Sequence, residues 1–149
     1  MKRIKLVLTT IAVLLCSVMV NAHDFEVDGI FYNILSSTDL TVEVTYRGPA
    51  VGYYPDCYRE SVVIPSSVTY ENKVYTVNRI DLAFYECSNL TSITIPETIN
   101  EITSRSFYGC YNLIEVIIKD GNHTLSLGTS SDYNCNGRGL FSDCPLKSI

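Results

Sequence analysis

The chain has 149 residues, of which 46% are hydrophobic and 18% charged, a balance typical of one folded domain rather than a disordered chain. Its formal net charge is −5, and the three basic residues before residue 23 lie in a segment without acidic residues. Without that segment, 8 of the 11 basic residues remain against all 16 acidic ones, a net charge of −8. Such an acidic chain repels phosphate groups, so we expect neither nucleic acid nor anionic lipid as a partner.

The first 22 residues have the pattern of a secretory signal peptide. A basic start precedes an apolar run from Leu6 to Val20, and Ala22 supplies a small residue for cleavage. A membrane-spanning helix needs about 20 apolar residues, whereas this run is shorter and the polar His23 follows Ala22 directly. We therefore expect cleavage after Ala22 and an exported chain without a transmembrane segment. Lipid attachment at Cys16 is the minor alternative, because the residue before that cysteine is not small.

Residues 23–60 are expected to form a β cap. Three segments have the composition of β-strands: 25–27, 30–35 and 40–46. Asp28-Gly29, between the first two segments, favours a two-residue hairpin turn. A further hairpin is expected over residues 68–77, which alternate on both sides of a polar turn.

One pattern occurs three times in the second half of the chain. Residues 83–95 and 106–118 share Phe, Tyr, Cys, Asn and Leu at the same places, 23 residues apart, followed by two alternating aliphatic residues. A shorter copy occupies residues 140–149, and the Phe-to-Cys spacing is three in all copies. A period of 23 lies within the range of leucine-rich repeats. Because one such unit cannot bury its own apolar side, the copies are expected to stack.

Stacking predicts where the repeated side chains lie. The inward-facing strand positions of one copy are Ile93 and Ile95, and residues 62–65 supply an earlier strand with the same Ile-Pro ending. The repeated aromatic and thiol side chains are expected to form two columns, from Phe84, Phe107 and Phe141 and from Cys87, Cys110 and Cys144.

The fold predicted from these patterns is a mainly β repeat solenoid, a leucine-rich-repeat stack of about three to four short rungs with an N-terminal β-hairpin cap. The repeats are assigned to residues 61–149. The longer interval before the last copy places an inserted, exposed loop at residues 119–139, with a hairpin around residues 124–127.

The pattern Leu-x-x-Ile-x-Ile-Pro-x-x-Ile-x-x-Ile-x-x-x-Ser-Phe-x-x-Cys, from Leu90 to Cys110, resembles the BspA-type leucine-rich repeat of bacterial surface proteins. Residues 62–70 resemble the segment that leads from a β cap into the repeats of such proteins. The resemblance covers residues 25–149. It implies export to the exterior, the cell surface or the outer envelope of a bacterium, and adhesion to host or bacterial proteins. Function still has to be argued from a site, because one fold serves many functions.

Five cysteines remain after the expected cleavage, an odd number for an exported chain: Cys57, Cys87, Cys110, Cys135 and Cys144. Three of them share one repeat position, which favours buried thiols. Stacked rungs lie about 5 Å apart, so a bond between Cys87 and Cys110 stays open as an alternative. Cys57 and Cys135 lie in polar segments and are candidates for a pair.

No catalytic or metal-binding pattern accompanies the repeats. The sequence has no Cys-x-x-Cys, no Gly-x-Ser-x-Gly and no glycine-rich phosphate loop. A Cys-His pair would depend on His123 alone, for which we favour the interpretation as a solvated loop residue. We therefore expect no metal, no cofactor and no enzymatic activity, and an envelope hydrolase is only a third hypothesis.

Tyrosines near the cap are one part of the candidate interaction surface. Tyr53 and Tyr54, with Tyr58 close by, fit either rim packing or recognition, because tyrosine combines a large contact area with a polar tip. For Tyr85 and Tyr108, which follow the repeated Phe, packing is the favoured interpretation.

Outward-facing strand residues are the other part of the candidate interaction surface. Val63, Thr94 and Ile117 are expected to line the concave sheet, a surface that solenoids use for partners. Glu115 and Lys119 flank Ile117. The candidate surface therefore consists of Thr94, Glu115, Ile117, Lys119, Tyr53 and Tyr54.

The sequence thus indicates an exported binding module that mediates adhesion or contact with a protein or glycan at the cell surface. The alternative is a structural envelope protein, or a truncated repeat fragment, without a dedicated ligand. That alternative is based on Ile149, which falls within an expected strand and would leave the last rung open to self-association.

Overall fold

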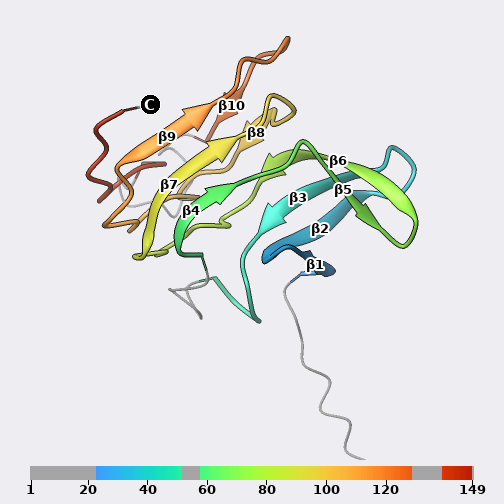
Figure 1. Ribbon diagram of the computed structural model, residues 1–149, viewed down its shortest axis with the longest axis horizontal. Coiled ribbons are helices and arrows are strands. Elements are labelled where there is room, and N and C mark those ends of the chain that lie inside the picture. The colour runs from blue at the N-terminus through green and yellow to red at the C-terminus, as the bar shows by residue number, and fades with distance from the viewer. Residues whose placement is uncertain (1–22, 52–57, 129–138, 149) are drawn as a thin grey trace, which may run out of the picture.

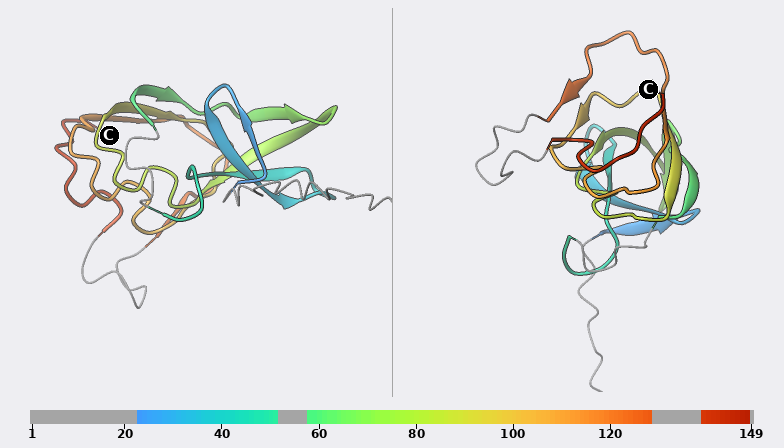
Figure 2. Two further views of the ribbon diagram at one scale, coloured as in Figure 1. Left: turned by 90° about the horizontal axis from the view of Figure 1, so that it is seen from below. Right: turned by 90° about the vertical axis from the view of Figure 1, so that its left-hand side faces the viewer.

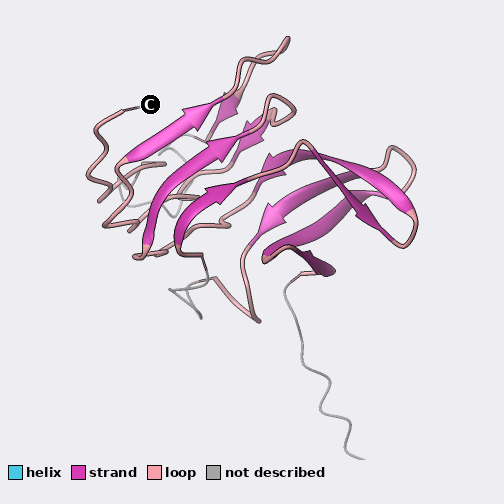
Figure 3. Cartoon of the chain, in the orientation of Figure 1, coloured by secondary structure: helices cyan, strands magenta, loops and turns pink. Residues whose placement is uncertain are grey.

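The computed structural model describes residues 23–51, 58–128 and 139–148 (Figure 1). In these residues the chain forms ten β-strands and no helix (Figure 3). The strands are β1 (Phe25–Val27), β2 (Ile30–Ser36), β3 (Thr41–Thr45), β4 (Glu60–Val63), β5 (Ser67–Tyr70), β6 (Lys73–Ile80), β7 (Leu90–Ile95), β8 (Glu101–Ile102), β9 (Glu115–Ile118) and β10 (Ser126–Leu127).

The strands form two sheets, which are two walls of a stack of rungs. One sheet has the order β1-β2-β3-β6-β8-β10, with β5 paired to β6, and the other has the order β4-β7-β9. The view along the stack, in the right panel of Figure 2, shows successive rungs winding around a shared interior. This architecture confirms the predicted mainly β repeat solenoid.

The cap is built from the predicted hairpin. Strands β1 and β2 pair in antiparallel fashion, with Val27 opposite Ile30 across the Asp28-Gly29 turn. Both turn residues have a positive φ, 51° and 78°, as a two-residue hairpin turn requires. Strand β3 then pairs with β2 on one side and in parallel with β6 on the other. The cap is therefore hydrogen-bonded directly to the wall that the repeats continue.

The second predicted hairpin is also confirmed. Strands β5 and β6 pair with Tyr70 opposite Lys73. The two turn residues, Glu71 and Asn72, have φ values of 47° and 61°. Strand β6 extends beyond this hairpin, and its last residues pair in parallel with β8. The same strand thus belongs to the hairpin and to the repeat wall.

Parallel pairing keeps the rungs in register on both walls. Val62, Ile93 and Val116 are successive partners across β4, β7 and β9. On the other wall, Ile80 pairs with Ile102, which pairs with Leu127. The inward aliphatic side chains of the middle rungs are fully buried between the walls, with exposed fractions of 0–1%: Ile80, Leu90, Ile93, Ile95 and Ile102.

The repeated phenylalanines form the predicted column. The ring centroids of Phe84 and Phe107 are 5.1 Å apart with an interplanar angle of 2°, and those of Phe107 and Phe141 are 5.1 Å apart at 17°. This spacing is close to the distance of about 4.8 Å between paired strands. The turns that carry these rings are themselves linked, because the Phe84 N–H donates to the Ser106 carbonyl at 3.0 Å.

Tyr58 extends this column toward the cap. Its ring centroid lies 4.6 Å from that of Phe84, and only 3% of the residue is exposed. Its hydroxyl donates to the Thr45 carbonyl at 2.9 Å and accepts from the Phe31 N–H at 3.1 Å. Of the two interpretations left open for Tyr58, packing is therefore correct and recognition is wrong.

The repeat cysteines follow the phenylalanines as predicted, and they are thiols. The Cys110 Sγ donates to the Phe84 carbonyl and the Cys144 Sγ donates to the Phe107 carbonyl, both at 3.0 Å. Each of these thiols thus bonds to the preceding rung. Cys57 and Cys135 lie outside the described residues.

The turn after each phenylalanine contains a residue whose backbone is in the left-handed conformation. Two positions after the ring, Glu86, Gly109 and Asp143 have φ values of 56°, 73° and 65°. At Gly109 a Cβ atom would lie 3.1 Å from Glu86 Cγ, so a side chain there would be crowded as well as strained.

The hairpin expected around residues 124–127 is wrong. Strand β10 instead pairs in parallel with β8, so residues 126–127 belong to the repeat wall rather than to an exposed hairpin. Ile95 pairs with Ile118 and Ile102 pairs with Leu127, so the spans 95–102 and 118–127 are equivalent parts of successive rungs. The first span advances seven residues and the second nine, so two residues of the insertion precede β10. The remainder lies between β10 and Phe141, where residues 129–138 are outside the described residues.

A row of polar side chains crosses the outer face of the larger sheet. Arg79 contacts the carboxylates of Glu43 at 2.9 Å, Glu101 at 3.0 Å and Asp81 at 3.9 Å. Asn33 donates to the other Glu43 oxygen at 3.2 Å. The charges on this face are thus paired within the chain. Burial nevertheless raises the pKa of Glu43 above its ordinary value, outweighing its bonds to Asn33 and Arg79.

Replacing Phe107 by alanine removes the middle ring of the column. We expect this change to lower the free energy of unfolding by about 3–5 kcal/mol, because it leaves a cavity between rungs. Urea unfolding measures the change. Tyr111→Ala is the control, since the Tyr111 side chain is 57% exposed, and it should cost less than about 0.5 kcal/mol. Equal losses in the two variants would contradict the column.

The raised pKa of Glu43 predicts a pH dependence. The folded chain holds the Glu43 proton more tightly than the unfolded chain, so this stabilising contribution is complete at low pH and is lost as pH rises through the folded pKa. Glu43→Gln resembles the protonated form at every pH. Between about pH 4 and about pH 8 the wild type should therefore lose stability relative to Glu43→Gln in urea unfolding. A wild type that gains stability relative to the variant would contradict this.

Candidate functional site

The outer face of the β4–β7–β9 sheet brings predicted site residues together. Val63 pairs with Thr94, and Thr94 pairs with Ile117, so the three side chains form one row across the sheet. Figure 1 shows these three strands side by side. Side chains of a strand alternate between its faces. Burial of Ile93 and Val116 on the inside therefore directs Thr94 and Ile117 outward, as predicted.

This row is apolar and open. Val63 is 61% exposed and Ile117 is 46% exposed, which places them among the exposed large hydrophobic residues of the described chain. Thr94 is half-buried between them. We call Val63, Thr94 and Ile117 the central row.

Polar groups border the central row. Ser61, Ser92 and Glu115 form the neighbouring row, in which the Ser92 hydroxyl donates to that of Ser61 at 2.9 Å. Lys119 follows β9, its side chain is exposed, and its N–H donates to the Ile95 carbonyl at 3.0 Å. Thus Glu115 and Lys119 lie on either side of Ile117 along the chain, and the face combines an aliphatic centre with a polar border.

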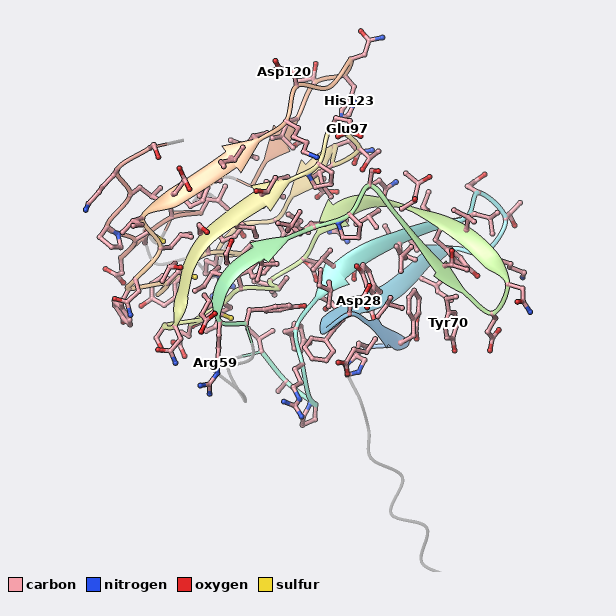
Figure 4. The ribbon with its side chains drawn as sticks, in the orientation of Figure 1. Asp28, Arg59, Tyr70, Glu97, Asp120 and His123 are labelled. Carbon is pink, nitrogen blue, oxygen red and sulfur yellow. The ribbon has the colours of Figure 1, made fainter. Side chains whose placement is uncertain are left out.

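Two adjoining clefts lie beside the free edge of β4. They have volumes of about 400 and about 260 Å³, and both are lined by Asp28, Ile30 and Val63. They separate the tip of the cap hairpin from β4, and Figure 4 shows Asp28 there, between the cap and the repeats. Val63 belongs to both the clefts and the central row. The sequence predicts the turn at Asp28 but not where its tip docks, so this part of the surface was missed.

A third cleft, of about 410 Å³, lies where the insertion leaves β9. Glu97, Asp120 and His123 line it, and Figure 4 shows them near one another. The His123 Nε2 atom lies 2.9 Å from the Ile99 carbonyl oxygen, so the exposed ring also anchors its loop. Within the described part of the chain, no three His, Cys, Asp or Glu residues gather closely enough to hold a metal ion.

The structure describes only some of the tyrosines discussed in the sequence analysis. Tyr53 and Tyr54 lie outside the described residues, so their assignment stays a prediction. Tyr85 and Tyr108 pack against each other with ring centroids 5.3 Å apart, as the favoured interpretation expects. Within residues 23–51, 58–128 and 139–148, the chain has no helix that is long and apolar enough to cross a membrane.

Solved structures of bacterial leucine-rich repeat proteins are similar to this chain. A leucine rich cell surface protein from Faecalibacterium prausnitzii A2-165 is 26% identical with a TM-score of 0.57, over 84% of this chain and 29% of that one. A leucine-rich repeat protein from Bacteroides ovatus ATCC 8483 is 28% identical with a TM-score of 0.61, over 85% and 35% of the two chains. One from Bacteroides capillosus ATCC 29799 is 27% identical with a TM-score of 0.50, over 64% of each.

The chain thus spans about a third of the first two of these proteins. Comparison with curated proteins found no match. The family described as BspA type leucine rich repeat region (6 copies) matches residues 29–149, which contain all the rungs and most of the cap. This chain therefore belongs to the BspA-type leucine-rich repeat family.

Proposed function

We propose that the chain is a cell-surface binding module whose central row contacts a protein partner, as an adhesion contact. The observation that carries this proposal is the pair of exposed aliphatic side chains, Val63 and Ile117, on the outer face of the hydrogen-bonded β4–β7–β9 sheet. Removing apolar surface from water is favourable by about 25 cal/mol per Å². A partner that covers this row therefore gains binding energy without rearranging the sheet.

The surroundings of the row fit a protein interface. Such interfaces place an apolar centre inside a polar border, and here Ser61, Ser92, Glu115 and Lys119 provide the border. The outer face of the larger sheet is different, because Arg79 already pairs with Glu43 and Glu101. These charges therefore already have partners within the chain.

The central row also favours protein over glycan. Its middle residue, Thr94, is the only one of the three with a hydroxyl group, so the row offers few hydrogen bonds to a sugar ring. Val63 and Ile117 instead complement the aliphatic and aromatic side chains of a protein. Exposure at the cell surface is supported by the signal-like residues 1–22 and by the similarity to a cell surface protein of Faecalibacterium.

Two charged substitutions test this surface. The purified chain is screened for binding to host matrix and surface proteins, and the Kd of each saturable partner is then measured by surface plasmon resonance. Val63→Glu/Ile117→Glu should raise that Kd at least tenfold, which corresponds to about 1.4 kcal/mol, because it introduces charge at the centre of the contact.

Val74→Glu is the matched control. Val74 is 59% exposed, close to the 61% of Val63, but it lies on the β5–β6 hairpin. The control should bind like the wild type. If the double variant also binds like the wild type while folded, the contact lies elsewhere and the proposal is wrong. Failure of every protein tested to bind in a saturable way, with binding to glycans instead, would also overturn it.

A further inference from the structure

Strand β4 has one free edge in the described part of the chain, where its only sheet partner is β7. The N–H groups of Glu60 and of Ile64, which directly follows the strand, donate to carbonyls of the next rung at 2.8 and 3.0 Å. Because successive residues of a strand direct their N–H and carbonyl groups to opposite sides, those of Ser61 and Val63 point to the free edge. Neither of these two N–H groups has a partner among the described residues.

The two clefts beside the cap follow this free edge. Ser61 and Val63 line the smaller cleft, and Val63 and Pro65 line the larger one. Asp28 and Ile30 of the cap hairpin line both clefts, so the hairpin stands across the gap from β4. In Figure 1 and in the left panel of Figure 2, β4 is the strand of its sheet nearest to this hairpin. Main-chain groups that point from an edge strand into an open cleft are free to pair with an extended peptide, which becomes an added strand.

The edge accommodates one short strand. Pro65, the next residue in the outward series, has no N–H, so the row of donors ends at Val63. At the start of the strand the register shifts between Glu60 and Ser61, and such irregularities interrupt pairing at a sheet edge. With the cap turn opposite, the clefts have two walls instead of an open face. A single extended peptide therefore fits this edge, whereas the longer sheet edge of a second copy does not.

The lining of the larger cleft indicates which side chains the peptide carries. Asp28 is its only charged lining residue and is exposed. No other described residue forms an ion pair with Asp28. Apolar side chains make up most of the remaining lining: Val27, Ile30, Tyr32, Val63, Pro65 and Val68. The cleft thus complements a lysine or arginine next to aliphatic residues, whereas Arg59 adds a positive charge only to the smaller cleft.

We propose that the free edge of β4 binds an extended, basic segment of a protein partner. The segment pairs with Ser61 and Val63 as an added strand and places a lysine or arginine beside Asp28. Main-chain pairing supplies the affinity, and the side chains of the cleft supply the selectivity. The inference rests on the proposed function, because Val63 belongs both to the clefts and to the central row, so one protein partner contacts both.

A phage-displayed library of random short peptides, selected on the folded, purified chain, tests this edge. Enriched peptides should carry a lysine or arginine among alternating β-branched residues. When an enriched peptide binds the wild-type chain, amide hydrogen exchange at Ser61 and Val63 should become slow. Enrichment of no peptide, enrichment of acidic peptides, or binding that leaves exchange at these two residues unchanged overturns the proposal.

Val63→Pro removes one N–H from the free edge. Proline is accepted in an edge strand where its nitrogen faces outward, and the hydrogen bonds between β4 and β7 do not use this N–H. The Kd of the selected peptides should rise about fivefold. Val63→Ala is the control, because it shortens the side chain but keeps the N–H, and it should have the smaller effect. A smaller effect of Val63→Pro than of Val63→Ala overturns the strand pairing, and the exchange measurement on the wild type decides the case if Val63→Pro does not fold.

Asp28→Asn removes the charge of the larger cleft. Asparagine tolerates the positive φ of this turn position, which is 51° at Asp28. The Kd of the selected peptides should rise about threefold, and it should depend less on salt concentration. Asp120→Asn makes the same change at an exposed residue of the third cleft and should bind like the wild type. Equal effects of the two substitutions overturn the pairing of the basic residue with Asp28.

Ile117→Glu separates this inference from the proposed function. Ile117 lies on β9, which β7 separates from β4, so this variant should bind the selected peptides like the wild type. Loss of peptide binding in Ile117→Glu places the peptide on the central row, which overturns the edge site and leaves the proposed function intact. Whole protein partners that bind Ile117→Glu like the wild type, but lose affinity for Asp28→Asn, contradict the central row instead and support the edge site.

Discussion

Each rung of this chain is held in place by the neighbouring rungs, through one shared translation of about 4.8 Å. The translation appears as parallel pairing on two walls and as the 5.1 Å ring spacing of Phe84, Phe107 and Phe141 in the turns. The turns are joined as well, since the N–H groups of Phe84 and Phe107 donate to carbonyls of the next rung at 3.0 and 3.2 Å. A rung displaced on one wall would lose its partners on all sides.

The outer surface is a consequence of this constraint. Pairing places Val62, Ile93 and Val116 in line on the inside, and the alternation of a strand then places Val63, Thr94 and Ile117 in line on the outside. The pairing that aligns the core therefore also fixes the order of the central row across the three strands. Its side chains can change without altering the stack, which separates the residues that specify the fold from those that select a partner.

Much of the fold could be predicted because its signals are local or periodic. Asp28-Gly29 favours a hairpin turn by its own conformational preferences, and the repeated Phe and Cys positions predict columns once the copies stack. The outward direction of Thr94 and Ile117 follows from strand alternation in the same way.

Other features depend on contacts that the local pattern does not contain. Tyr58 lies 26 residues before Phe84 rather than 23 and has no cysteine three positions later, so nothing marks it as a member of the column. The alternation of polar and apolar residues at 124–127 favours extended backbone but does not indicate its partner, which is the distant β8 rather than a neighbouring hairpin strand. The clefts beside Asp28 exist only because the cap hairpin docks near β4.

Residue-resolved amide hydrogen exchange of the folded chain tests the shared register most directly. The N–H groups of Glu60, the first residue of β4, and of Ile64, which directly follows β4, donate to carbonyls of the next rung at 2.8 and 3.0 Å. Because successive N–H groups of a strand point to opposite sides, those of the alternate residues Ser61 and Val63 point to the free edge. The account predicts slow exchange at Ile64 and fast exchange at Ser61 and Val63. Equal exchange rates along β4, or slow exchange at Val63 with fast exchange at Ile64, would contradict it.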